Sequence, residues 1–268
     1  MHFIGYIASL AIGISLGLIG GGGSILTVPV LVYLFRISPV MATAYSLFIV
    51  GSTSLVGALP KYKKGLVNLK TALIFGAPSI AAVFATRKYI VPMIPEELIS
   101  LGGFLITKNI LMMLLFAILM VTASVSMIRN KKDNIEEKKV EVQKFNVPVI
   151  MVEGIVVGMV TGLVGAGGGF LIIPALVLLS NLPMKQAIGT SLLIIAAKSL
   201  IGFIGDLSNY QMDWILLISV TFLAIIGIFI GNWLSHKVSS KKLEFVFGWF
   251  VLIMGIYIII KEIFFQHI

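Results

Sequence analysis

Residues Gly17–Leu34 read GLIGGGGSILTVPVLVYL, and residues Gly162–Leu179 read GLVGAGGGFLIIPALVLL. The offset of 145 residues continues without a gap to Gly57 and Gly202, and 17 of the 41 aligned positions are identical. Each copy is a long apolar run with a cluster of glycines near its middle. Corresponding apolar segments that are interrupted by glycine in both halves of a chain are typical of the binding site of a secondary transporter. The sequence therefore predicts two repeats and a solute pathway through a membrane.

The composition supports an integral membrane protein. Of the 268 residues, 59% are hydrophobic and 12% are charged, whereas roughly 25% of the residues of a soluble domain are charged. The mean hydropathy is +1.09. The net charge of +9 does not indicate nucleic-acid binding, because most Lys and Arg residues stand in short clusters between apolar runs, where they orient a membrane protein. The chain has no Cys, so disulfide and thiolate chemistry are excluded.

A membrane span needs roughly 20 apolar residues, and eight runs are long enough. They are Phe3–Phe35, Val40–Leu59, Leu66–Tyr89, Ile110–Ile128, Val147–Leu179, Gln186–Ile204, Trp214–Leu234 and Leu243–Ile260. We expect a first transmembrane repeat over residues 1–128, a cytoplasmic polar linker over 129–146 and a second repeat over 147–268. The N-terminal stretch lacks a basic leader region, so we interpret it as a retained helix and not as a cleaved signal peptide.

The first run is too long for one straight span. Its 33 residues would form a helix of about 50 Å, which exceeds a hydrocarbon core of about 30 Å. Each glycine also costs around 1 kcal/mol in a helix relative to alanine. We therefore expect two half-helices joined by extended backbone at Gly20–Gly23, and the same arrangement at Gly165–Gly169. Either a re-entrant loop or two short spans would fit.

Charges between the runs predict the sides of the membrane. Basic clusters at Lys61–Lys64, residues 129–144 and His236–Lys242 are expected to be cytoplasmic. The loop Gly205–Asp213, which carries Asp206 and no cation, is expected to be external. A further loop of mixed charge holds Arg87, Lys88, Glu96, Glu97 and Lys108. Because equivalent loops fall on opposite sides, the pattern predicts an inverted repeat with both termini external.

The paired motifs resemble the TauE/SafE family of sulfite exporter-like membrane permeases. The match rests on G-x-x-G-G-G-G-S-x-L-x-x-P at Gly17–Pro29 and on G-x-x-G-A-G-G-G-x-L-x-x-P at Gly162–Pro174. The resemblance implies export of sulfite or related sulfur-containing anions across the cell membrane, without ATP and without a prosthetic group.

A substrate-binding site is expected at the glycine clusters that interrupt the first helix of each repeat. Freed N–H groups and the positive end of a helix dipole favour an anion, and glycine lets backbone approach it closely. Close helix packing is the structural alternative for these glycines. The hydroxyls of the next helices either join this site or bond to the preceding turn, and Ser24 is expected to begin the second half-helix. The candidate substrate-binding residues are Gly20, Gly21, Gly22, Gly23, Ser24, Ser46, Gly165, Gly167, Gly168, Gly169, Thr190, Ser191 and Lys198.

Lys198 is the clearest single candidate, because it lies about twelve residues into an apolar run with no acidic residue nearby in sequence. A cation at that depth marks a solute pathway, a proton relay or a counter-ion. The alternative is that its side chain extends to the external surface near Asp206. No carboxylate is identified as buried, so proton coupling stays open. No His, Asp or Glu residues have the spacing of a metal or hydrolytic site, and no catalytic residue is predicted.

The sequence thus predicts an all-α polytopic membrane protein of two inverted repeats, each a Gly-broken helical hairpin plus three transmembrane helices. It is expected to export a small anionic substrate by alternating access through the lipid bilayer. A channel-like anion facilitator is one alternative. A non-transport membrane protein, either a scaffold or an intramembrane enzyme, is another. The exact substrate, the coupling ion and the oligomeric state stay undetermined.

Overall fold

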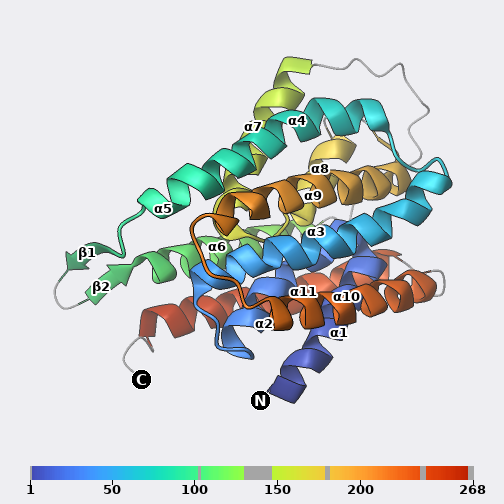
Figure 1. The fold of residues 1–268 in the computed structure, drawn as a ribbon. Helices are drawn as coiled ribbons and strands as arrows, with labels where there is room; N and C mark the ends of the chain where they lie inside the picture. Colours follow the sequence, from blue (N-terminus) through green and yellow to red (C-terminus); the bar gives the residue numbers. More distant parts are fainter. Residues whose placement is uncertain (1, 102–103, 130–146, 179–181, 236–239, 265–268) are drawn as a thin grey trace.

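The computed structural model describes residues 2–101, 104–129, 147–178, 182–235 and 240–264, which are mostly helical, with one short strand pair and connecting turns (Figure 1). The first half contains α1 (His2–Ile19), η1 (Gly20–Leu26), α2 (Thr27–Tyr33), α3 (Pro39–Lys63), α4 (Leu69–Ala85), η2 (Thr86–Ile90), α5 (Val91–Met93), β1 (Glu97–Leu101), β2 (Phe104–Thr107) and α6 (Lys108–Arg129). The second contains α7 (Val147–Val164), α8 (Gly169–Leu178), α9 (Met184–Leu207), α10 (Trp214–Leu234) and α11 (Ser240–Phe264). The antiparallel pair of β1 and β2 was not predicted.

The transmembrane character is confirmed. Among the described residues, eight helical stretches are long and apolar enough to cross a membrane, and they coincide closely with the predicted runs. Large apolar side chains stand on the outside of the molecule, such as Ile215, Phe222 and Ile253, which are 83%, 63% and 62% exposed. Exposed apolar surface of this kind suits a hydrocarbon environment. The predicted polar linker falls mostly on residues 130–146, outside the described part of the chain.

The chain reverses direction at the first glycine cluster. The rings of Tyr6, early in α1, and Phe35, just after α2, have centroids 5.5 Å apart. Near the turn, the Ser15 hydroxyl donates to the Gly23 carbonyl oxygen at 3.2 Å. A continuous helix would separate Tyr6 and Phe35 by about 40 Å, so α1 and α2 form a hairpin. The helix break is therefore present within the 31-residue stretch Phe3–Tyr33.

The backbone at the breaks is not extended, which corrects our expectation. Gly20–Leu26 forms a 3₁₀ helix, whose i→i+3 bonds use backbone groups that an extended segment would leave free. At the second break, Gly165, Gly167 and Gly168 have φ values of +71°, +65° and +71° before α8 begins at Gly169. Only glycine adopts such angles without strain, so a tight left-handed turn replaces the expected extended strand.

The two halves pack through equivalent contacts. A Cβ on Gly13 of α1 would overlap the Ala224 carbonyl of α10, and a Cβ on Gly158 of α7 would lie 2.6 Å from the Ser79 carbonyl oxygen of α4. These two contacts are related by the same offset of 145 residues. Gly57 of α3 likewise approaches Leu192 of α9 at 3.7 Å.

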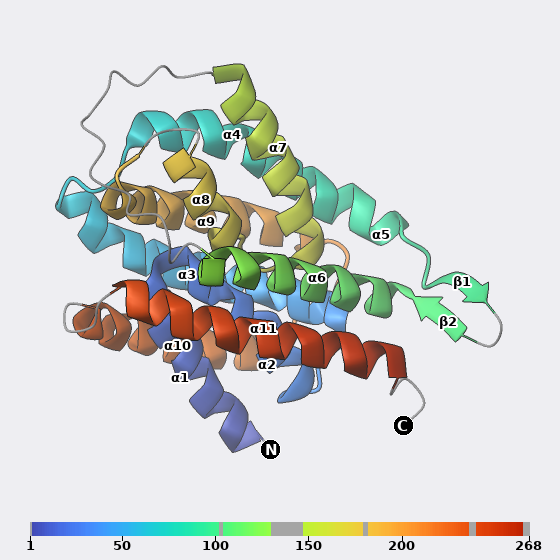
Figure 2. The ribbon, with the colours of Figure 1, turned by 180° about the vertical axis from the view of Figure 1, so that it is seen from behind.

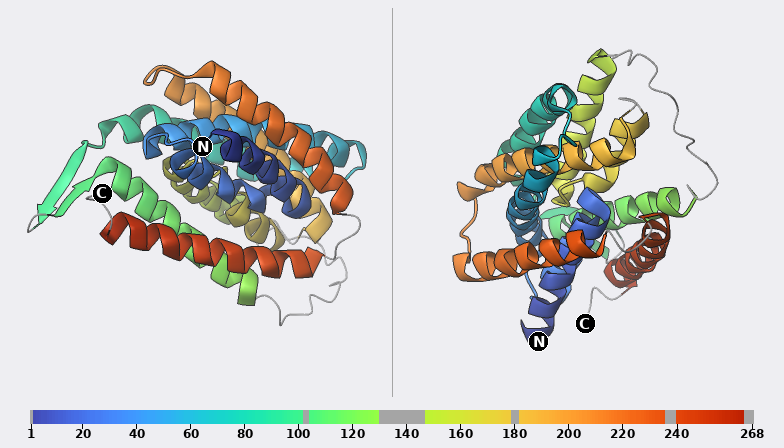
Figure 3. Two further views of the ribbon diagram at one scale, coloured as in Figure 1. Left: turned by 90° about the horizontal axis from the view of Figure 1, so that it is seen from below. Right: turned by 90° about the vertical axis from the view of Figure 1, so that its right-hand side faces the viewer.

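The helices that follow the two breaks, α3 and α9, run antiparallel at the centre. A Cβ on Gly202 would lie 3.5 Å from Leu47, which is the repeat counterpart of the contact between Gly57 and Leu192. Helices α6 and α11 lie side by side on the face seen in Figure 2, and Figure 3 shows them from two further directions. Equivalent helices therefore meet in pairs. The inversion of the repeats across the membrane stays a prediction.

Two predicted loop positions are wrong. The helix of α4 continues through η2 and α5 to Met93, so Arg87 and Lys88 are not in a loop, and the Arg87 side chain is fully buried. Asp206 lies in the last turn of α9 and is also fully buried. Charged residues are expected to mark the ends of apolar runs. The helices continue through Arg87 and Asp206, and both side chains are buried.

Candidate functional site

The two glycine breaks meet in the interior of the protein. A Cβ placed on Gly169 would overlap the backbone of Gly21, and one on Gly167 would lie 3.5 Å from the Ser24 Cβ. All four residues are buried. The contact needs glycine, because any side chain at Gly21 or Gly169 would separate the two segments.

A buried lysine lies at the second break. The Lys198 side chain is 1% exposed, and its Nζ donates to the Thr161 Oγ1 of α7 at 2.8 Å. The same Nζ lies 2.9 Å from the position that a Cβ on Gly168 would occupy. Among the described residues, no carboxylate forms an ion pair with Lys198. The side chain therefore does not extend to the external surface, and an amine without a buried counter-ion adjoins the glycine turn.

Backbone donors gather at the same turn. The Gly165 N–H bonds to the Thr161 carbonyl, and the N–H groups of Leu171 and Ile172 bond to the Gly168 carbonyl. Within the described residues, no backbone acceptor is found for the N–H groups between Gly165 and Gly169. Unpaired amides beside an amine can bind a negatively charged oxygen atom.

The first break is apolar by comparison. Gly20 has a φ of +73°, and a Cβ on Gly20 would lie 2.8 Å from the Ile188 side chain. A Cβ on Gly22 would lie 3.1 Å from the Ile19 side chain, and one on Gly23 would overlap Leu16 and Ser15. Gly22 and Gly23 therefore pack against the end of α1, and the contact with the second break is made by Gly21.

The predicted hydroxyls divide into two groups. Ser24 donates to the Gly21 carbonyl at 2.8 Å and lies inside η1, so it does not begin α2 as expected. Ser191 donates to the Ile188 carbonyl at 2.9 Å, and Thr190 accepts the Asn68 N–H at 2.9 Å. These three hydroxyls make bonds within the protein. Ser46 is buried without a hydrogen-bond partner among the described residues.

Sequence reasoning missed a second charged group next to the break. The Arg87 Nη1 lies 3.6 Å from the Asp206 Oδ2 and donates to the Thr43 Oγ1 at 3.0 Å. Thr43 in turn touches Gly165, since a Cβ on that glycine would lie 2.5 Å from the Thr43 carbonyl oxygen. The Asp206 carboxylate, which was expected in an external loop, is therefore buried beside the break.

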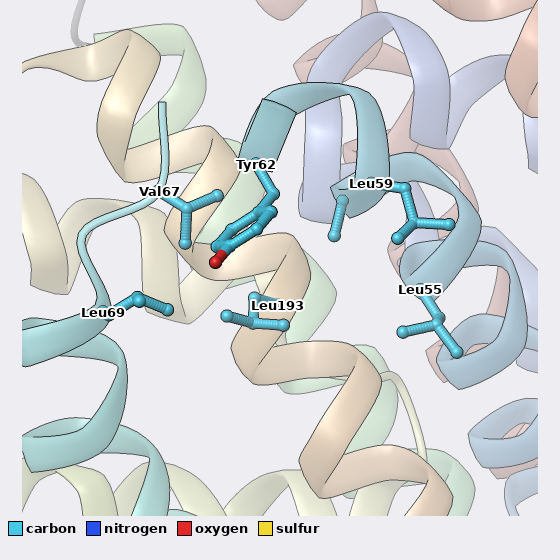
Figure 4. A pocket seen from close by; sticks show the side chains of 7 residues that line it. Leu55, Leu59, Tyr62, Val67, Leu69 and Leu193 are labelled. Atoms are coloured by element: carbon cyan, nitrogen blue, oxygen red, sulfur yellow. The ribbon is translucent and has the colours of Figure 1, made fainter. Parts of the chain in front are cut away.

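An apolar groove of about 250 Å³ lies away from this charged region (Figure 4). It is lined by Leu55, Ala58, Leu59, Tyr62, Val67, Leu69 and Leu193. Because this lining carries no charged side chain, the groove is unsuited to an anion. Among the described residues, no group of three or more His, Asp or Glu side chains could hold a metal ion.

Comparison with known proteins gives the family and the general role. Residues 6–258 match the family model described as Sulfite exporter TauE/SafE. The chain is 30% identical over 251 residues to a "Probable membrane transporter protein" of Xylella fastidiosa (strain 9a5c), covering 92% of this chain and 91% of that protein. It is 28% identical over 222 residues to a protein of Bacillus subtilis (strain 168) with the same description, covering 82% and 84%. No solved structure is significantly similar.

Proposed function

Because the chain belongs to the sulfite exporter TauE/SafE family of membrane transporters, we propose that it exports small sulfur-containing anions, such as sulfite or an organosulfonate. The observation that carries this proposal is the position of Lys198. Its amine adjoins the Gly168 turn, where the two glycine breaks meet, and it has Thr161 as its hydrogen-bond partner.

The chemistry of this position favours a pyramidal or tetrahedral oxyanion. An anion there would accept hydrogen bonds from the Lys198 amine and from the free amides between Gly165 and Gly169. Its charge would stabilise the protonated amine, because a nearby opposite charge favours the ionised form. The glycines leave no Cβ between backbone and solute, so several oxygen atoms could be bound at once.

The arrangement of the repeats supports transport by alternating access. Each break connects a hairpin to a central helix, α3 or α9, and equivalent helices pack on each other. Rocking of one repeat against the other would open the contact between Gly21 and Gly169 to one side at a time. Inverted repeats around a midplane site move in this way in other secondary transporters.

Counterflow in proteoliposomes tests the proposal. Vesicles would be loaded with unlabelled sulfite, sulfate, thiosulfate or the sulfonate taurine, and uptake of the radiolabelled anion would be followed. Saturable counterflow that requires internal anion supports a transporter, whereas uptake without this requirement supports the channel-like facilitator. Absence of movement for all four solutes would refute the proposed substrate class.

Variants at equivalent positions test the site. Lys198→Ala is expected to lower kcat/KM by about 10- to 100-fold, because a hydrogen bond to a charged group is worth about 1.5–3 kcal/mol. The matched control is Thr53→Ala, which changes the equivalent position of α3, where the hydroxyl donates to the Ile49 carbonyl at 2.6 Å. The control should retain transport. Equal kcat/KM values for Lys198→Ala and wild type would eliminate Lys198 as an anion ligand.

A further inference from the structure

The buried pair of Arg87 and Asp206 is not bonded as a permanent structural pair would be. Both side chains are 0% exposed, yet their closest nitrogen and oxygen atoms are 3.6 Å apart, which is too long for a direct hydrogen bond. Among the residues that the structure describes, neither Asp206 oxygen has a hydrogen-bond partner, and neither has the Nε or the Nη2 of Arg87. Buried charges are retained at reasonable cost only when their remaining donors and acceptors are satisfied.

The pair stands beside the second glycine break. Thr43 connects them, because its hydroxyl accepts from Arg87 at 3.0 Å while its backbone contacts Gly165. Lys198 adjoins the other end of the same turn at Gly168. Two cationic side chains from different helices, η2 and α9, therefore flank one short glycine segment.

The free donors of Arg87 have the geometry that an oxyanion needs. A guanidinium carries five N–H donors in one plane, and only one of its nitrogens, Nη1, has a hydrogen-bond acceptor among the described residues. The unpartnered Nε and Nη2 can form two parallel bonds to a single carboxylate, sulfite or sulfate group. Burial increases the strength of such bonds, since water does not compete.

Tyr210, in the turn after α9, is a further titratable group close to the pair. Burial and the charges of Asp206 and Glu96 raise the pKa of its phenol, and the charge of Arg87 opposes this shift. The phenol is therefore neutral at physiological pH. Asp206 is the single carboxylate within ion-pair distance of Arg87 in the described part of the chain.

We propose that Arg87 is a second anion-binding residue of the pathway, and that Asp206 is an intramolecular competitor which occupies Arg87 until a solute anion displaces it. This inference rests on the proposed function. An anion that leaves Lys198 would move along the Gly165–Gly168 turn to Arg87, and the return of Asp206 would release it. The long contact between Arg87 and Asp206 suits a bond that must be exchanged in each cycle.

The proposal predicts opposite changes of KM for substitutions of Asp206 and of Arg87. Asp206→Asn removes the competing charge with little change of shape, so the KM for sulfate and thiosulfate counterflow should fall by roughly tenfold, while kcat falls because release becomes slow. Arg87→Gln removes the binding group, so KM should rise by roughly tenfold or more. Lys at this position keeps the charge without the planar fork, and Arg87→Lys should give an intermediate KM.

A purely structural pair predicts a different pattern. Both single variants would then lower the thermal unfolding midpoint, KM would change in the same direction or not at all, and the variant with both substitutions would regain stability. An unchanged or raised KM in folded Asp206→Asn would overturn the inference. If Arg87→Gln does not fold, the KM of Arg87→Lys decides, and a wild-type value would count against the proposal.

The outcome is separable from that of the proposed function. If the wild-type protein moves none of the tested anions, the proposed function itself fails. If the wild-type protein transports and Lys198→Ala is impaired, but Asp206→Asn has no lowered KM, only the competitor role of Asp206 fails.

Discussion

The contact between the second glycine break and α3 can be measured by comparing two glycines with nearly equal backbone angles. Gly165 and Gly65 have φ values of +71° and +68°. A Cβ on Gly165 would lie 2.5 Å from both the carbonyl oxygen and the Cβ of Thr43, whereas a Cβ on Gly65 would have no atom within 4 Å. Alanine at either site has the same conformational strain, and only Gly165→Ala adds a clash.

The structure allows an estimate of the loss of folding stability in each variant. A left-handed conformation costs alanine about 1–2 kcal/mol, which is the expected loss of stability in Gly65→Ala. Overpacking adds about 1–3 kcal/mol, and the backbone atoms of Thr43 cannot rotate away as a flexible side chain could. Gly165→Ala should therefore lose about 2–5 kcal/mol.

Thermal unfolding in detergent, followed by tryptophan fluorescence, measures both variants. At about 2–4 °C for each kcal/mol, Gly65→Ala should lower the midpoint by about 2–8 °C, and Gly165→Ala should lower it by several degrees more. Equal midpoints for the two variants would refute the packing of the second break on α3. The connection from Gly165 through Thr43 to Arg87 would then have no basis.

Three further outcomes are expected. Thr161→Val removes the acceptor of the buried amine of α9 and should raise the KM for sulfate counterflow roughly tenfold, whereas Thr161→Ser should retain the wild-type value. Because the chain has no Cys, a single introduced cysteine reports which side of the membrane its loop faces. A membrane-impermeant maleimide added to intact cells should label Asp213→Cys and not Lys64→Cys. The reverse labelling pattern would overturn the predicted orientation. Gly169→Ala should abolish folding or transport, because its methyl group would overlap the backbone of Gly21 in the first break. Gly22→Ala should be tolerated, because its methyl group would meet only the Ile19 side chain, at 3.1 Å. Equal behaviour of the two variants would contradict the contact between the breaks.

The spans and the breaks were predictable because they depend on local properties of the sequence. An apolar run of given length either fits a bilayer or does not, and Gly20–Gly23 cannot stabilise a helix that is already too long. The conformation within the break was not predictable. Glycine permits the 3₁₀ helix of Gly20–Leu26 and the left-handed turn of Gly165–Gly168 as readily as extended backbone, and only the packing between halves selects among them.

Of the charged residues of the site, Lys198 was predictable from the sequence, whereas Arg87 and Asp206 were not. Lys198 stands deep in an apolar run, and its burial was foreseeable from its position. Arg87 and Asp206 stand near run ends, where charges usually face water. Their pairing depends on the packing of α4 against α9, which brings together residues far apart in the sequence. The one available signal was that the apolar run resumes after Lys88, at Tyr89–Met93.

The helices around the site are repeated in the two halves of the chain, but the charged side chains of the site are not. At the offset of 145 residues, Lys198 corresponds to Thr53 and Arg87 corresponds to Asn232, so neither cation has a charged counterpart. A frame of two similar halves can adopt two conformations of similar energy, which alternating access requires. The solute imposes no such symmetry, since one anion needs one set of donors. Cations at both breaks would also repel each other across the buried contact of Gly21 with Gly169. Under the proposed function, concentrating the charge at the second break would let a single anion neutralise the centre of the protein in either conformation.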